Sequence, residues 1–203
     1  SGEVVLPHEM KFLGNAFYNC PRLTGTIRIP EGLTEVNNFA APNMTGDVII
    51  PQGVKKVNGI GGQLSSIYFP EGVEEIGFEA FWKRTSLKGD LKLPSTIKKI
   101  GIRGFAGTQF SHVALPEKLE IIESEVFNGC TSLIDTLTIP NSVVQIKDYA
   151  FSNCKNLNAI ILPENLNQIW GNSMDGCWSL DFIQCNAKEP PLVEGGGFTG
   201  IEK

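Results

Sequence analysis

The sequence predicts a solenoid of stacked repeats, because one pattern recurs about every 22 residues over most of the 203-residue chain. Three observations support this fold class. An apolar residue followed by proline returns at regular intervals, apolar and polar residues alternate before each proline, and apolar residues stand at fixed distances after it. About eight repeats are expected, anchored at Pro7, Pro30, Pro51, Pro70, Pro94, Pro116, Pro140 and Pro163.

The segment before each proline predicts a short strand. Ile27 and Ile29 flank Arg28, and Leu91 and Leu93 flank Lys92. Alternation with a period of two places one face of a strand in the core and the other face outside. Proline ends the strand because it has no N–H to donate. The strands of successive repeats are therefore expected to stack as one parallel sheet along a single right-handed solenoid.

The segment after each proline predicts the opposite, turn-rich side. The third and sixth residues after Pro70 are Val73 and Ile76, and the other repeats keep both positions apolar. A small residue and a large one follow, as in Ala80-Phe81 and Ala150-Phe151. We expect loops and turns here, with single helical turns at these pairs. A repeat of this length cannot bury its apolar side alone, so stacking must build continuous apolar columns.

Two repeats depart from this pattern. Between Pro30 and Pro70, Ala40-Ala41 replaces the small-aromatic pair, and the sequence NGIGG at residues 58–62 shortens the turn. These repeats are expected to be irregular on their outer side. The glycines of 58–62 precede a strand and not a helix, so they predict a tight turn and not a phosphate-binding loop.

Composition and charge exclude several classes of protein. Hydrophobic residues make up 41% and charged residues 19% of the chain, which argues against a disordered segment. The net charge is −5, with 17 Lys and Arg against 22 Asp and Glu, which argues against a nucleic-acid-binding protein. No apolar stretch reaches the length of a membrane-spanning helix. We expect residues 1–203 to form one solenoid domain.

The five cysteines predict a structural column. Four of them fall in the same position of their repeats: Cys20, Cys130, Cys154 and Cys177. Buried thiols packed as small apolar groups are the favoured interpretation. A Cys130–Cys154 or a Cys154–Cys177 disulfide remains open, because stacked positions lie within disulfide range. No C-x-x-C motif is present, which argues against a zinc or redox site.

No motif predicts a catalytic, cofactor-binding or metal-binding residue. His8 and His112 lie in distant repeats, and none of the common nucleotide-binding or hydrolase motifs is present. Ser66, Asp90 and His112 would be neighbours across the sheet, but in an order that puts the carboxylate in the middle. A nucleophile needs the imidazole beside it, so the sequence argues against an enzyme.

The outward-facing strand positions predict a binding surface instead. Positions two and four residues before each proline form two columns on the open sheet face. Charged and aromatic side chains gather in the middle of these columns: Arg28, Asp47, Tyr68, Asp90, Lys92 and His112. An aromatic anchor with charges of both signs around it suits protein recognition. Trp82, Trp170 and Trp178, expected near the loops, leave carbohydrate binding as an alternative.

The repeats resemble the BspA-type leucine-rich repeats of bacterial cell-surface and secreted proteins. The best copies run from Leu133 to Cys154 and from Leu157 to Cys177. The resemblance covers nearly the whole chain and is weakest between Pro30 and Pro70. It implies a leucine-rich-repeat solenoid at the cell surface or secreted, without a cofactor, in a non-enzymatic binding or adhesion role.

The partner implied by this resemblance is a protein of host or extracellular-matrix type. A structural spacer and a carbohydrate-binding module remain alternatives. The resemblance also implies that residues 181–203 close the array. A further short strand usually follows in such arrays, so the end at Lys203 suggests a piece of a longer protein.

Overall fold

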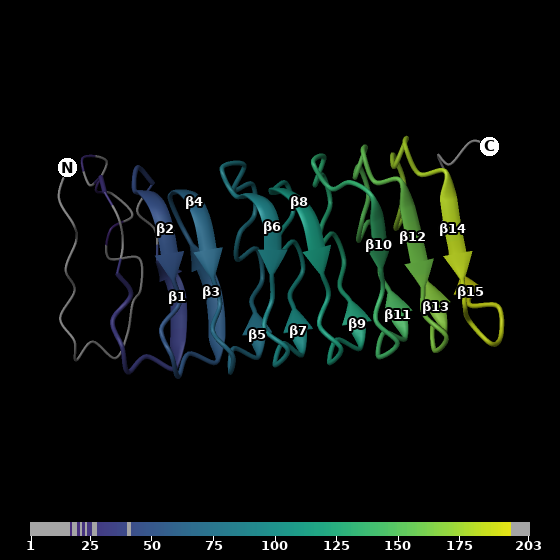
Figure 1. The fold of residues 1–203 in the computed structure, drawn as a ribbon, viewed down its shortest axis with the longest axis horizontal. Coiled ribbons are helices and arrows are strands. Elements are labelled where there is room, and N and C mark those ends of the chain that lie inside the picture. Colours follow the sequence, from purple (N-terminus) through teal and green to yellow (C-terminus); the bar gives the residue numbers. More distant parts are fainter. Residues whose placement is uncertain are drawn as a thin grey trace.

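The computed structural model describes residues 28–39 and 42–195, together with the separate positions 17, 20, 22, 24 and 25. In this part of the chain about seven coils stack along one axis, with strands in two rows (Figure 1). One coil corresponds to one repeat. The predicted leucine-rich-repeat solenoid is therefore confirmed, and its first predicted repeat lies outside the described residues.

The first row contains the longer strands, and all of them except β14 stand just before the prolines as predicted. They are β2 (Thr45–Ile49), β4 (Gln63–Tyr68), β6 (Lys88–Lys92), β8 (Gln109–Ala114), β10 (Thr136–Thr138), β12 (Ala159–Leu162) and β14 (Phe182–Cys185). All pairings within this row are parallel. The register joins equivalent repeat positions, such as Asp47 with Ser66 and Asp90 with His112.

This row is not the single sheet that the sequence predicts. It is divided into the sheets β2–β4, β6–β8 and β10–β12–β14. The two interruptions coincide with the two spacings of 24 residues, from Pro70 to Pro94 and from Pro116 to Pro140. The described residues show no strand pairing across either interruption.

A second row of strands runs along the turn-rich side. Its members are β1 (Glu35–Phe39), β3 (Lys56–Ile60), β5 (Glu75–Ile76), β7 (Lys99–Ile100), β9 (Ile121–Ile122), β11 (Gln145–Ile146), β13 (Gln168–Ile169) and β15 (Leu192–Val193). They form the parallel sheets β1–β3–β5–β7 and β9–β11–β13–β15. Most of these strands contain the apolar residue six positions after the proline. The sequence indicated that this residue is buried but not that its backbone pairs.

Aromatic rings form the centre of the core from β5 onward. Phe81, Phe105, Phe127 and Phe151 are buried and stack nearly parallel, with successive ring centroids 5.2, 5.8 and 5.8 Å apart. The same repeat position supplies each ring. A continuous apolar cluster extends from Ile29 to Leu180 around them.

The segments that carry these rings form a ladder between coils. The N–H of Phe81 donates to the Gly104 carbonyl at 2.8 Å, that of Phe105 to Val126 at 3.0 Å, and that of Phe127 to Ala150 at 2.8 Å. The donor in each case belongs to the earlier coil and the acceptor to the later one.

Positive φ angles recur in this ladder, at 50° for Glu79 and 56° for Lys83. Such left-handed residues interrupt a right-handed helix. The expected single helical turns are therefore wrong: the described residues form successive turns here and contain no helix.

The shortened coils differ on this side, as predicted. β1 and β3 are five-residue strands that pair directly, where later coils have two-residue strands followed by turns. Gly61 and Gly62 alone join β3 to β4, with Gly62 at a φ of 102°. The tight turn predicted for Gly59, Gly61 and Gly62 is therefore confined to Gly61 and Gly62, because Gly59 lies within β3.

The cysteine column is a column of free thiols. Cys130, Cys154 and Cys177 are buried, and each donates to the carbonyl of a core phenylalanine in the preceding coil, at 3.1 to 3.3 Å. Burial raises the pKa of the Cys130 thiol to about 11. Neither candidate disulfide is formed.

Other residue types replace cysteine in the same position of earlier coils. The Thr108 hydroxyl donates to the Phe105 carbonyl at 2.8 Å, and Arg84 Nε donates to the Ile60 carbonyl at 3.2 Å. The shared property of this position is therefore a hydrogen-bond donor and not a thiol.

Candidate functional site: the open strand face

The outward face of the long-strand row carries two exposed apolar side chains at its N-terminal end. Ile49 is 65% exposed on β2, and Tyr68 is 60% exposed on β4. The strand register makes them direct partners, so they lie side by side. This pair gives the face an exposed apolar contact point.

A carboxylate and a hydroxyl lie next to this pair on the same two strands. The Ser66 hydroxyl donates to Asp47 Oδ1 at 2.7 Å. The ladder shifts register here, because β4 has one extra residue, Ser65, between the partners of Gly46 and Asp47. The same irregularity recurs on β8, where Ser111 is the extra residue between the partners of Gly89 and Asp90.

His112 of β8 lies between two carboxylates. Its Nδ1 is 2.8 Å from Asp90 Oδ1, and its Nε2 is 3.2 Å from Asp135 Oδ2. All three side chains are at least half exposed. The hydrogen bonds to Asp90 and then to Asp135 raise the pKa of His112 above its ordinary value.

The structure groups the predicted site residues in two sets. Asp47 and Tyr68 lie on the paired strands β2 and β4, whereas Asp90, Lys92 and His112 lie on the paired strands β6 and β8. Arg28 is exposed before Ile29 and belongs to no strand. Whether these residues bind a partner is a prediction that geometry alone does not test.

Asp135 is the residue that sequence reasoning missed. Counting four positions back from Pro140 gives Thr136, so the predicted column contained that threonine and not its neighbour. Asp135 has a φ of 59°, and its N–H donates to Asn158 Oδ1 at 3.2 Å. An aspartate tolerates this left-handed conformation. No spacing rule in the sequence identifies it.

The arrangement does not provide a nucleophile with its base. Ser66 bonds to Asp47, while both ring nitrogens of His112 face carboxylates. This matches the sequence argument against a Ser66, Asp90 and His112 triad. Within the described ranges, no group of three His, Cys, Asp or Glu side chains is placed to hold a metal ion. In the same ranges no helix is long and apolar enough to cross a bilayer.

The three tryptophans differ in exposure and in their neighbours. Trp178 is 72% exposed, with Lys155 Nζ 4.6 Å from its ring centroid. Trp82 is 38% exposed, with Lys83 Nζ 4.5 Å from its ring. Trp170 is half-buried, and its Nε1 is enclosed without an acceptor.

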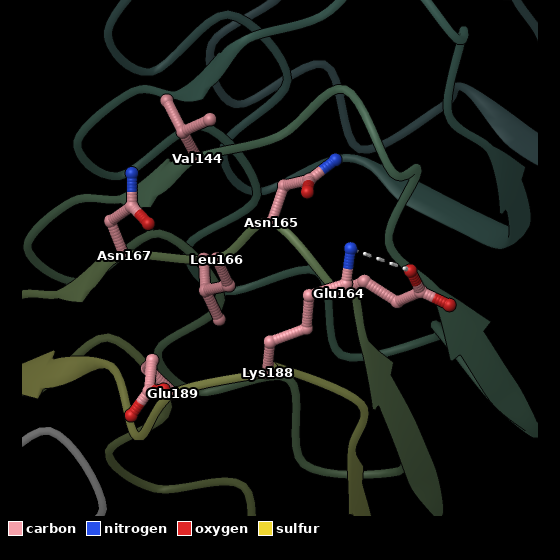
Figure 2. A pocket seen from close by; sticks show the side chains of 7 residues that line it. All are labelled: Val144, Glu164, Asn165, Leu166, Asn167, Lys188 and Glu189. Atoms are coloured by element: carbon pink, nitrogen blue, oxygen red, sulfur yellow. Dashed lines mark ion pairs between the residues drawn. The ribbon is translucent and has the colours of Figure 1, made fainter.

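A shallow depression of about 410 Å³ lies near the C-terminal end (Figure 2). Its lining includes Asn165, Asn167 and the ion pair between Lys188 and Glu164, whose Nζ–Oε2 distance is 3.8 Å. The side chains spread around its rim and do not converge on a common point. The open strand face therefore remains the better candidate site.

Comparisons with known proteins agree with this architecture. The family model described as "BspA type Leucine rich repeat region (6 copies)" matches residues 3–89 and 59–181. A comparison with curated proteins finds no match to the chain.

Two solved structures are similar in fold. A leucine-rich-repeat protein from Bacteroides ovatus ATCC 8483 has a TM-score of 0.62 and 20% identity, over 97% of this chain and 71% of that one. A leucine-rich cell surface protein from Faecalibacterium prausnitzii A2-165 has a TM-score of 0.57 and 19% identity, over 88% of this chain. This chain spans 66% of the length of the latter protein.

Proposed function

Because the chain belongs to the BspA-type leucine-rich-repeat family, we propose that it is a non-enzymatic binding module of a bacterial surface or secreted protein. Its partner is a protein, of host or extracellular-matrix type. The cell-surface description of the Faecalibacterium protein supports the location. The non-enzymatic role is supported by the site itself, where Ser66 bonds to Asp47 and both ring nitrogens of His112 face carboxylates.

The observation that carries this proposal is the exposed pair Ile49 and Tyr68 on neighbouring strands. Asp47 lies on the same strand pair, and Asp90, Lys92 and His112 lie on the next strand pair, β6 and β8, so charges of both signs stand beside the apolar pair. An aromatic side chain in a polar rim is the usual composition of an interface hot spot. Parallel pairing fixes the strands that carry these side chains, so binding on this face costs little conformational entropy.

A binding screen of the intact chain tests the proposal. Extracellular-matrix proteins, plasma proteins and polysaccharides are presented, and saturable binding to one protein is expected. Tyr68→Ala should weaken that binding by about 2 kcal/mol, roughly 30-fold, as for a central aromatic anchor. Tyr68→Ala combined with Lys92→Glu should weaken it further.

The matched control is Phe78→Ala. Phe78 is an equally exposed aromatic residue, at 63%, but it follows β5 on the turn side. If Phe78→Ala lost binding and Tyr68→Ala bound as well as the wild type, the contact would lie on the turn side and the proposal would be contradicted. No saturable binding by a correctly folded chain would favour a structural spacer.

Trp178 keeps a carbohydrate-binding alternative open, because it is the most exposed of the large hydrophobic side chains that the structure describes. Added polysaccharide should then quench its fluorescence. A Trp178→Ala variant with unchanged protein binding and no quenching by any sugar would remove this alternative.

A further inference from the structure

His112 lies where the long-strand row is interrupted. β6 and β8 form one sheet, and β10 begins another, with no strand pairing between β8 and β10 among the described residues. A backbone bond from Ile134 N–H to the Ser111 carbonyl, 3.1 Å long, approaches this interruption. The contact between His112 and Asp135 is one side-chain link across it, and Gln109 of β8, which accepts from the Ser132 hydroxyl at 2.7 Å, provides another.

The number of protons on the imidazole decides how many of its contacts are hydrogen bonds. Ionised carboxylates only accept, so each contact needs an N–H from the ring. The imidazolium has two such groups and donates to Asp90 and Asp135 together. Neutral imidazole has one, so its other nitrogen directs a lone pair at a carboxylate and that contact is repulsive.

The charges around the ring come from three segments. β6 contributes Lys88, Asp90 and Lys92, but the register pairs Lys88 with Gln109 and Lys92 with Ala114, which leaves Asp90 opposite His112. β8 carries no other titratable side chain, and β10 carries none. Asp135, just before β10, completes the set.

We propose that His112 is a protonation-controlled link between the two sheets on the open strand face. With two ring protons it holds Asp90 and Asp135 together across the interruption. Loss of one proton releases one carboxylate and makes the face more negative by one charge. Resting on the proposed function, this makes the affinity of the protein partner depend on pH over the titration of His112.

The hydrogen bonds to Asp90 and then to Asp135 raise the pKa of His112, so the linked state persists to a higher pH than it would for an unperturbed histidine. The direction of this pKa shift determines how the stability of the fold depends on pH. The folded chain binds the His112 proton more tightly than the unfolded chain does. The stabilisation is full below the unfolded pKa and is lost as the pH rises through the folded pKa.

The first experiment is an imidazole ¹H–¹⁵N NMR titration of the intact chain, from about pH 5 to about pH 9. The chain has 2 histidines, and His8→Asn removes the other set of signals. The midpoint for His112 should lie above that of a histidine peptide, and Asp90→Asn and Asp135→Asn should each lower it. A midpoint at or below the peptide value would overturn the link, as would an Asp135→Asn variant with an unchanged midpoint.

A second measurement follows the sheets themselves. Amide exchange at residues 136–138, corrected for its intrinsic pH dependence, should speed up through the His112 midpoint in the wild-type chain and not in His112→Asn. Identical profiles in the two proteins would refute the link.

Partner binding is the last arm. The ratio of affinities at about pH 6 and about pH 8 should depart from one for the wild type and approach one for His112→Asn. If the ratio were the same in the wild type and in His112→Asn, the regulatory role would be refuted. The NMR measurements need no partner, so a failed binding screen and a failed link are distinguishable.

Discussion

The coils before β5 and those from β5 onward enclose their apolar cores with different backbone structures on the turn side. In the earlier coils, with proline spacings of 21 and 19 residues, β1 and β3 pair over most of the turn side. In the later coils, with spacings of 22 to 24 residues, paired strands of two residues give way to a ladder of turns over stacked phenylalanines. A few residues per repeat therefore decide whether the outer backbone is extended or turned.

The difference follows from the number of residues in each repeat. A strand advances about 3.3 Å per residue, so a short repeat must extend its backbone to close the coil. A longer repeat has residues to spare, and these form turns with left-handed positions at Glu79, Arg103 and Glu125. These turns carry the stacked rings of Phe81, Phe105, Phe127 and Phe151.

The largest effect is expected from Phe105→Ala, which removes a ring from the middle of the stack. Phe105 is fully buried and contacts the rings of Phe81, Phe110 and Phe127. The free energy of unfolding should fall by about 3–5 kcal/mol. Urea unfolding followed by circular dichroism measures it. Phe39→Ala is the comparison in the earlier coils, where the described ring contact is with Phe17 alone; an equal loss there would show that the stack adds nothing beyond burial.

An intermediate effect is expected where the two regions meet. A methyl group at Gly77 would overlap Asn58 Oδ1 of the last extended coil, an amide that also donates to Asn37 Oδ1 at 2.6 Å. Gly77→Ala should therefore destabilise the chain by about 1–3 kcal/mol. In an Asn58→Ala background the same change should cost less, because the overlapping group is gone. Additive losses in this double-mutant cycle would contradict the close approach.

The control for this junction is Gly171→Ala among the later coils. The nearest atom to its added methyl group is Asp148 Oδ1 at an ordinary 3.5 Å. No loss of stability is expected there. A loss equal to that of Gly77→Ala would mean that both glycines act through backbone conformation.

The smallest effect is expected from Cys130→Ala in the donor column of the later coils. The change removes the bond to the Phe105 carbonyl and leaves that buried acceptor dependent on Thr108, whose hydroxyl also bonds it. The free energy of unfolding should fall by about 1 kcal/mol. Cys185→Ala, at an exposed position of β14, should change nothing. Equal effects at both sites would argue against a structural role for the column.

The repeat spacing was sufficient to predict the solenoid, the long strands and the thiol column. It could not predict the second row of strands, because one apolar residue such as Ile76 or Ile100 has no period to detect. The turn ladder was missed because left-handed residues there include Glu79 and Lys83, types with no preference for that conformation. Its bonds also join residues more than twenty positions apart.

The candidate site shows a similar limit. Counting from the prolines brought Asp90 and His112 together correctly, because strand register follows repeat position. Asp135 lies one residue outside that count and reaches the ring through its own backbone conformation. Contacts between equivalent repeat positions can be predicted from the spacing of the repeats, whereas contacts between non-equivalent positions require the structure.

The ladder of turns has an electrical consequence. In its ladder bonds the donor lies in the earlier coil and the acceptor in the later one, from Phe81 and Gly104 to Phe151 and Ser173. The peptide dipoles of this column therefore point the same way and add along the axis, as they do in a helix. The strands of the second row beside this column bond in the opposite sense: the Gly101 N–H donates to the Ile76 carbonyl at 2.8 Å and the Lys147 N–H to the Ile122 carbonyl at 2.9 Å. The turn side therefore carries two antiparallel columns of peptide dipoles, which oppose one another along the axis.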